Sequence, residues 1–420
     1  MTTLRALCFT LALLSFSAHA APSAPLTEQQ AIALFFQRNL ALIAANYNID
    51  QARAEEVIAA AIPNPVFSLS FNELSNQMGK AGDARALPGV NPQIQQLIET
   101  AGKRGLRTES AELGTEAAEF DLQDVTRTLV NAVRHAFYAL LLAQKNLDVA
   151  RDTTARYQQI TDANAVRLRA GDISETDFTR IEVEGLKAQG DLDRAQAALK
   201  QARADVLLLL GWPGDSLDIR AAEAWPVANL AASLTQEDTL TQQAMAQRPD
   251  VLAARVRIRQ AEKNRELARR LAIPDVTVSA GYARDPGNYF TNTGNVGISV
   301  PLPLFYRQEG EIAKADVAWN AAELNLRQSE QSVRADVAKA LSAWQSADAI
   351  ARRFEQAVVG RIEKLRAAQE FAYQKGAAGL LDLIDAERNY KAMMLDYYTA
   401  LANRSNAWAD LLMALGETVK

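Results

Sequence analysis

The stretch Gly376–Glu387 reads G-A-A-G-L-L-D-L-I-D-A-E, and the stretch Gly171–Glu182, 205 positions earlier, reads G-D-I-S-E-T-D-F-T-R-I-E. Asp382 and Asp385 are three residues apart just after the glycine-containing turn, so on a helix their carboxylates share one face. Long sequence without proline runs away from both stretches in both directions. Each stretch is therefore predicted to be the tip of a long helical hairpin.

Two long segments contain no proline, Gln93–Trp212 and Leu304–Lys420. Proline inside a helix costs about 3 kcal/mol or more, and both segments are rich in Ala, Leu, Glu, Gln, Arg and Lys, which favour helices. We expect hairpins over residues 102–211 and 306–416. The glycines of their turns are Gly171, Gly376 and Gly379.

Four short segments alternate between apolar and polar residues. In residues 66–73, Phe67, Leu69 and Phe71 fall on one face and serines on the other, which predicts a strand with one apolar face. Similar strands are expected at about 93–100, 275–282 and 294–301. The side chains expected to face lipid are Phe67, Leu69, Phe71, Val276, Val278 and Tyr282.

The remaining periodic segments predict a helix over residues 27–61, capped by Thr27, and a helix over 240–271 that is interrupted at Pro249. The fold class is then mostly α with a small β part. The order of elements repeats, which predicts a first repeat over 21–212, a linker over 213–239 and a second repeat over 240–420.

The first twenty residues have the features of a secretory signal peptide. Arg5 precedes an apolar run, and Ala18-His19-Ala20 has the small-residue pattern of a cleavage site. We expect residues 1–20 to be removed on export. Cys8 is the only cysteine, so the mature chain is expected to lack a cysteine for lipidation.

The composition argues against several classes of function. The formal net charge is −5 and no basic stripe is present, so nucleic acid is not an expected partner. The sequence has no glycine-rich phosphate loop, nucleophile elbow or metal-ligand cluster, so we expect no enzyme activity, no catalytic residue and no cofactor. Four strands are too few to close a barrel, so strands that enter a membrane must be pooled between copies of the chain.

The duplicated plan, the signal peptide and the hairpin turns resemble the TolC family of outer-membrane efflux channels. The most specific part of this resemblance is L-L-D-L-I-D-A-E at residues 380–387, with Tyr373 nine residues before Asp382. The run E-T-A-G-K-R-G-L-R at residues 99–107 is similar to the Czc-type heavy-metal branch of the family.

The resemblance implies a homotrimer with a twelve-stranded β-barrel in the outer membrane lipid and a periplasmic tunnel of α-helices. It implies a periplasmic adaptor (membrane fusion) protein and an inner-membrane RND pump as partners. The chain would be the passive exit duct of this tripartite system, located in the outer membrane with a periplasmic extension. The cargo implied by the Czc-like motif is heavy-metal cations.

The resemblance also implies roles for residues at the tip. Asp382 and Asp385 match aspartates that line the periplasmic constriction, and copies around an oligomer would form a charge ring. The alternative is a purely structural role, in which the two aspartates are solvated at the start of a helix and are favoured there by the helix dipole. Tyr373 matches a tyrosine that locks the gate. The arginine that accompanies it in the family is replaced here by Ala378.

Two further groups are weaker candidates. Asp172, Glu175 and Asp177 form a second acidic group, for which a solvated turn is an equally good interpretation. His135 falls in an apolar stripe and is expected to be a buried, hydrogen-bonded side chain, not a metal ligand. No metal site is expected in the chain itself.

Other functions remain open at this point. Within the channel class, the alternative is a drug-efflux channel or a type I secretion channel. From a different class, a periplasmic adaptor or scaffold protein also carries helical hairpins. Two tandem copies with amphipathic strand pairs favour the channel.

Overall fold

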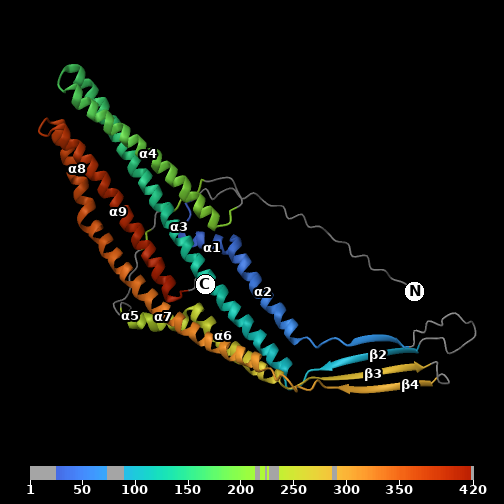
Figure 1. Ribbon diagram of the computed structural model, residues 1–420. Helices are drawn as coiled ribbons and strands as arrows, with labels where there is room; N and C mark the ends of the chain where they lie inside the picture. The colour runs from blue at the N-terminus through green and yellow to red at the C-terminus, as the bar shows by residue number, and fades with distance from the viewer. Residues whose placement is uncertain are drawn as a thin grey trace, which may run out of the picture. The chain divides into compact units, whose positions relative to one another are not determined.

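The computed structural model describes residues 25–72, 89–212, 218–222, 225–226, 236–285 and 291–417 (Figure 1). The predicted signal peptide lies outside the described residues, as does part of the predicted linker. The chain divides into two compact units. One contains Met1–Leu40, Leu129–Asn229 and Ser342–Leu411, and the other contains Ala41–Thr128, Leu230–Leu341 and Leu412–Lys420.

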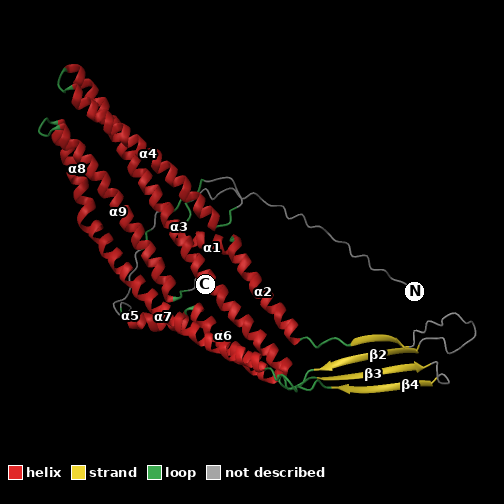
Figure 2. Cartoon of the chain, viewed as in Figure 1, coloured by secondary structure: helices red, strands yellow, loops and turns green. Residues whose placement is uncertain are grey.

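The structure is mostly helical with one small sheet, as the sequence predicts (Figure 2). The helices are α1 (Glu28–Arg38), α2 (Leu40–Ala60), α3 (Lys103–Ala170), α4 (Glu175–Leu209), α5 (Glu237–Gln247), α6 (Pro249–Leu271), α7 (Glu309–Arg353), the π-helical segment η3 (Phe354–Val358), α8 (Val359–Gln374) and α9 (Leu380–Leu415). Among the described residues, none of these helices is both long and apolar enough to cross a membrane.

The predicted single helix over residues 27–61 is wrong, because the helix breaks at Asn39. Thr27 caps α1 in a capping box with Gln30, as the sequence predicts. Asn39 has an extended backbone, and its Nδ2 donates to the carbonyl of Leu209 at 2.7 Å. This side-chain hydrogen bond satisfies the carbonyl of Leu209 at the end of α4. The tertiary contact therefore overrides the local helical pattern at Asn39.

The four strands form one antiparallel sheet in the order β1-β2-β3-β4 (Figure 1). Their bounds are β1 Val66–Asn72, β2 Gly89–Ile98, β3 Val276–Asp285 and β4 Thr291–Ser299. The second strand therefore begins four residues earlier than predicted. In the register, Phe67 lies opposite Ile94, and Val278 opposite Ile298, so apolar side chains of neighbouring strands share a face.

Apolar residues at helical spacing in α3 pack in the unit that contains the tips of both hairpins. Val133, Phe137, Leu140 and Leu141 are buried, as the spacing predicts, whereas Leu129 is half-buried. Each fully buried side chain of this size contributes about 1.5–3 kcal/mol. These residues anchor the middle of α3 in the core of this unit.

The two hairpin turns are where the sequence predicts them. Gly171 ends α3 with φ +79°, and Gly376 follows α8 with φ +72°, a conformation that strains residues with a side chain. The second hairpin differs from the first in one unpredicted respect. The helix that leads to its tip is interrupted by the π-helical segment η3, whereas α3 is continuous.

Candidate functional site

Asp382 and Asp385 lie in the first two turns of α9, and both are exposed. The backbone N–H of Gly379, the residue before α9, donates to Asp382 Oδ2 at 2.9 Å, so Asp382 completes the cap of its own helix from the third position. Asp385 lies 3.6 Å from the guanidinium of Arg388. The sequence-based alternatives are thus compatible, because a capping carboxylate at an exposed tip still carries its charge.

The second acidic group is built in a similar way. Ser174 caps α4, accepting from the N–H of Asp177 at 3.0 Å and donating to its carboxylate at 2.8 Å. Arg180 lies 3.6 Å from the same carboxylate. Asp172 and Glu175 are exposed. Ser174 was not predicted as part of the tip, although a serine three residues before an acidic residue is the signature of such a cap.

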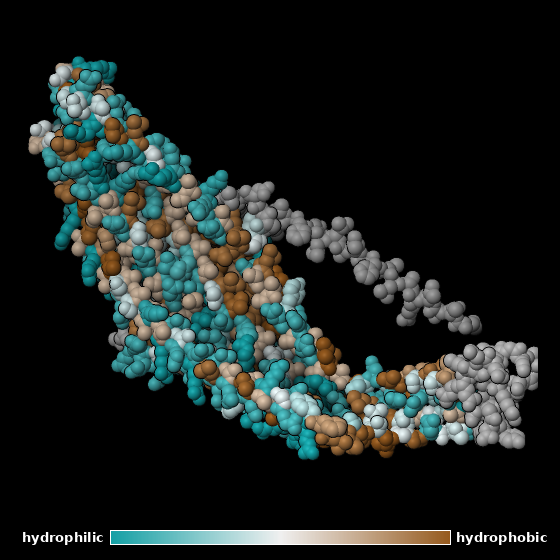
Figure 3. All heavy atoms as spheres, in the orientation of Figure 1, coloured by the Kyte–Doolittle hydropathy of each residue, from teal (hydrophilic) through white to brown (hydrophobic). Residues whose placement is uncertain are grey.

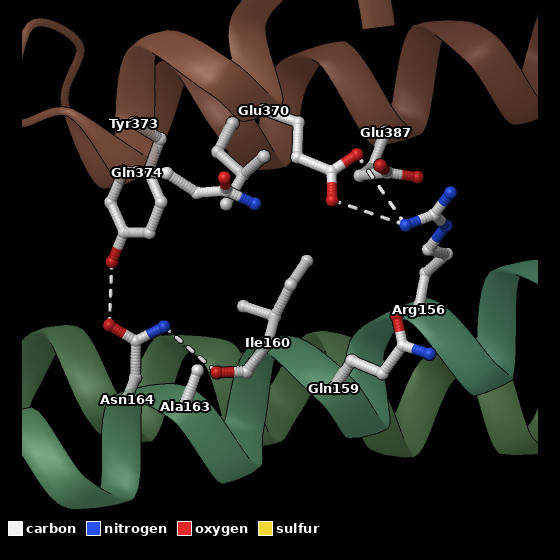
Figure 4. A pocket seen from close by; sticks show the side chains of 10 residues that line it. Arg156, Gln159, Ile160, Ala163, Asn164, Glu370, Tyr373, Gln374 and Glu387 are labelled. Carbon is white, nitrogen blue, oxygen red and sulfur yellow. Dashed lines mark hydrogen bonds and ion pairs between the residues drawn. The ribbon is translucent and has the colours of Figure 1, made fainter. Parts of the chain in front are cut away.

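Tyr373 joins the two hairpins (Figure 4). Its hydroxyl donates to Asn164 Oδ1 on α3 at 2.5 Å. Asn164 is buried, and its Nδ2 donates to the carbonyl of Ile160 at 2.8 Å, which fixes the orientation of the amide. Asn164 was missed at the sequence level because an asparagine within a helical pattern carries no signal of burial.

A cavity of about 260 Å³ lies beside this bond, between α3 and the helices α8 and α9 (Figure 4). Arg156 and Glu370 face each other across it, with Nη1 3.2 Å from Oε1. Glu387, the last residue of the quoted tip sequence, also lines it. The lining is mixed, with Ile160, Ala163 and Leu383 beside the polar residues, and the ion pair between Arg156 and Glu370 bridges it.

The pair of Glu387 and Arg366 is buried next to this cavity. The Nε of Arg366 donates to Glu387 at 3.0 Å, and its Nη1 donates to Asp152 of α3 at 2.8 Å. The guanidinium also stacks on the ring of Tyr390, 4.0 Å from its centroid. Burial by itself lowers the pKa of Arg366, but the bonds to Glu387 and Asp152 outweigh it, and the pKa is raised. This network was not predicted.

A second buried carboxylate joins α4 to α9. Glu184 accepts from Arg388 at 2.7 Å and from Lys187 at 2.7 Å. The hydrogen bond from Arg388 lowers the pKa of Glu184 to about 2, against the opposing effect of burial. The hairpins are therefore connected by ion pairs that include Asp152–Arg366 between α3 and α8 and Glu184–Arg388 between α4 and α9.

His135 is hydrogen-bonded, as predicted, but it is not buried. Its Nε2 donates to Asp410 Oδ1 at 2.8 Å, and 39% of its side chain is exposed. Burial raises the pKa of Asp410, but the bonds from His135 and Asn131 outweigh it and the pKa is lowered. Over the described residues, no group of three or more His, Cys, Asp or Glu side chains is arranged to hold a metal ion.

The run at residues 99–107 lies in the unit that contains the sheet, where it contacts residues next to the ends of strands and helices. Lys103 is buried, and its Nζ donates to the carbonyl of Ile273 at 2.5 Å and to Asp275 at 2.7 Å. Arg107 donates to the carbonyl of Ala59 at 2.8 Å and to Glu99 at 2.6 Å. The run thus bonds to a carbonyl in the last turn of α2 and to a carbonyl just after α6, which the sequence did not predict.

Comparison with known proteins relates this architecture to a family. The model of the outer membrane efflux protein family matches residues 31–212 and 240–417. The cobalt-zinc-cadmium resistance protein CzcC of Cupriavidus metallidurans is 26% identical over 393 residues, which cover 93% of this chain and 90% of that protein. The pyoverdine export outer membrane protein OpmQ of Pseudomonas putida is 25% identical over 374 residues, which cover 83% of this chain and 77% of that protein.

A solved structure has the same fold. The Neisseria gonorrhoeae MtrE outer membrane channel in its open state superposes with a TM-score of 0.78 at 21% identity, covering 94% of this chain and 89% of that chain. The family model matches both halves of the chain, including the strands and both hairpins. The chain therefore belongs to the outer membrane efflux protein family.

Proposed function

We propose that three copies of this chain form a passive exit duct for heavy-metal cations, the outer-membrane component of a tripartite efflux system. Each copy contributes four strands to a shared twelve-stranded barrel and its helices to a periplasmic tunnel. A periplasmic adaptor protein and an inner-membrane RND pump supply the cargo.

The sheet is the observation that supports this proposal most. Odd-numbered residues in β1 and even-numbered residues in β2, β3 and β4 share one face, which is mainly apolar up to the polar pair Arg284 and Asn292. Phe67, Val296 and Ile298 on this face are all strongly exposed. Among the described residues, the outer edges of β1 and β4 have no partner strand. Unpaired edges next to an apolar face are costly in lipid, so strands of further copies must complete them.

The opposite face of the same sheet is polar, as a water-filled lumen requires. It carries Ser68, Ser70, Gln93, Gln95, Thr277, Ser279 and Asn295. Gln96 is a polar residue on the apolar face, where its side chain donates to the carbonyl of Pro63 at 2.8 Å. On the face of the molecule shown in Figure 3, hydrophobic residues are visible along the strands, and on the helices they alternate with hydrophilic ones.

The chain contains two tandem repeats, residues 21–212 and 240–420, joined by residues 213–239. The order of elements supports this division, since helices α1 and α2, a strand pair and a hairpin are followed by α5 and α6, a strand pair and a second hairpin. In both hairpins the turn has a glycine with positive φ, and the helix that follows has an aspartate in its first turn that bonds to the preceding residues, Asp177 to Ser174 and Asp382 to Gly379.

The cargo is inferred from the tip and from a relative. Asp382 and Asp385 are exposed on one face of α9, so copies around a threefold axis would bring six carboxylates to the mouth. CzcC, the relative that aligns with 93% of this chain, is a cobalt-zinc-cadmium resistance protein.

The signal peptide is cleaved after Ala20, and the mature chain carries no lipid-modified cysteine.

The proposal is tested with the purified full-length protein and with a deletion strain. We expect trimers in detergent, ion conductance in planar bilayers and, after deletion, sensitivity to zinc, cobalt, cadmium, nickel or copper. A monomer that does not conduct contradicts the channel. Recovery in outer membranes after salt and carbonate washing distinguishes the channel from a periplasmic adaptor.

Export of an organic molecule is the second candidate, because a pyoverdine export protein also aligns with most of the chain. The same deletion strain separates the two. Unchanged metal tolerance together with new sensitivity to dyes assigns the duct to organic cargo, whereas metal sensitivity alone assigns it to cations.

A further inference from the structure

Tyr373 is contacted at two points by the first hairpin. Its hydroxyl is bonded to Asn164, as described above, and the guanidinium carbon of Arg167 lies 5.2 Å from the centroid of its ring. Asn164 and Arg167 are three residues apart on α3, so they belong to the same face of that helix. One face of α3 therefore contacts both the hydroxyl group and the aromatic ring of Tyr373.

A distance of 5.2 Å falls within the range at which a cation is attracted to the face of an aromatic ring. Arg167 and Tyr373 are both half-buried, so water screens this attraction less than it screens a fully exposed pair. Arginine suits such a contact because its planar guanidinium can stack and donate hydrogen bonds at once.

Arg167 and Tyr373 also line a cavity of about 520 Å³ together with both hairpin turns. Asp172 and Asp177 lie on its first-hairpin side, and Ala378 lies on the other. The lining therefore includes a guanidinium supplied by α3, although position 378 has only a methyl group. Both turns and their charged groups meet at this point.

We propose that Arg167 is a positioning residue that holds the mouth of the duct closed, by keeping the ring of Tyr373 and with it the tip of the second hairpin against α3. This inference rests on the proposed function, since a closed mouth has meaning only in a channel. Removing the guanidinium frees the ring but leaves the hydroxyl bond. The tip then separates from α3 more often.

The first test compares Arg167→Gln with Arg169→Gln in planar bilayers. Arg169 is the matched control, because it is exposed and its Nε donates only to the carbonyl of Ala165 in its own helix, at 3.2 Å. We expect Arg167→Gln to increase opening by about fivefold for each of the three tips, the size of one cation–aromatic contact, and so to raise the ratio of open to closed channels by at least that factor. Arg169→Gln should conduct like the wild type.

A second set of variants separates stacking from loss of charge. Tyr373→Phe keeps the ring and removes the hydroxyl bond, whereas Tyr373→Leu removes both. Arg167→Gln should still increase opening in the Tyr373→Phe background and should add nothing in the Tyr373→Leu background. An equal effect in both backgrounds, or an effect no larger than that of Arg169→Gln, overturns the proposal.

A third readout does not require conduction. Spin labels at Thr176→Cys and Ala377→Cys, both at exposed turn positions, report the distance between the two tips in the full-length protein. We expect longer distances in Arg167→Gln but not in Arg169→Gln. Longer distances in a protein that never conducts support the contact and contradict the channel. Unchanged distances contradict the role of Arg167 even if the protein conducts.

Discussion

Arg366 and Glu387 form an ion pair at 2.9 Å, and their side chains are only 9% and 2% exposed. Removing one partner of a buried pair leaves the other charge without compensation, which costs about 3–5 kcal/mol. We therefore expect Arg366→Met to lower the melting temperature of the purified protein strongly. Circular dichroism on heating measures this.

The control for this variant is Arg361→Met, because Arg361 is exposed on the same helix and exposed substitutions usually change stability by less than about 0.5 kcal/mol. The double variant Arg366→Met with Glu387→Met removes both charges and should recover much of the loss, since apolar replacements of buried pairs are often neutral. A single variant that melts with the wild type would show that the pair contributes nothing.

Glu184 predicts a pH dependence. The bond from Arg388 holds its pKa at about 2, below the ordinary value of a glutamate. A carboxylate with a depressed pKa in the folded state stabilises the protein above its unfolded pKa, and this stabilisation is lost as the pH falls toward 2. We expect Glu184→Gln to lower the melting temperature at pH 6 and to show a smaller further loss between pH 4.5 and pH 2 than the wild type.

The matched control is Glu182→Gln, since Glu182 is an exposed carboxylate on the same helix. Its melting curves should follow the wild type over the same pH range. Parallel pH profiles for the wild type and Glu184→Gln would mean that the bond to Arg388 does not stabilise the hairpins.

Asp382 and Asp385 predict the ion selectivity of the mouth. Asparagine can still cap a helix but carries no charge, so Asp382→Asn with Asp385→Asn removes charge without removing the cap. We expect the ratio of cation to anion permeability, measured from the reversal potential in a salt gradient, to fall in this variant. The difference should shrink at 1 M salt, where the screening length is about 3 Å.

Asp396→Asn serves as the control, because Asp396 is exposed on α9 but lies further along the helix from the turn. It removes one equivalent charge per chain. Because the tip variant removes two charges per chain, an effect in Asp396→Asn at least half as large as that in the tip variant would assign the change in selectivity to net charge and not to a ring at the mouth.

The sequence predicted those parts of the fold that depend on local pattern. The alternation of Phe67, Leu69 and Phe71 identified a strand face that the register confirms, and the turns at Gly171 and Gly376 followed from glycine between helix-forming segments. These features need only backbone conformational preferences and the period of apolar residues.

The parts that were missed depend on contacts between distant residues. The break at Asn39 requires the carbonyl of Leu209, 170 positions away, and the π-helical segment η3 has no proline or glycine within it. Glu387 was quoted as part of the tip, yet its burial follows only from the position of Arg366 on another helix. Charged residues in a helical pattern look alike whether they are solvated or paired.

Lys103 gives the last prediction, on the unit that contains the sheet. Its ammonium group donates to Ile273 and Asp275 and is only 4% exposed. Lys103→Met keeps the length of the side chain but removes the donor to the Ile273 carbonyl and the positive partner of Asp275, which then keeps only its bonds from Thr100. Losing such a partner costs about 1–3 kcal/mol. We expect a lower yield of folded protein and a lower melting temperature, measured on detergent-solubilised membranes.

Arg104→Gln is the control, because Arg104 is exposed and donates to the carbonyl of Ala60. If the two variants lose stability equally, the run at residues 99–107 acts through general charge, whereas a loss confined to Lys103→Met assigns it to the bonds at the ends of α6 and β3.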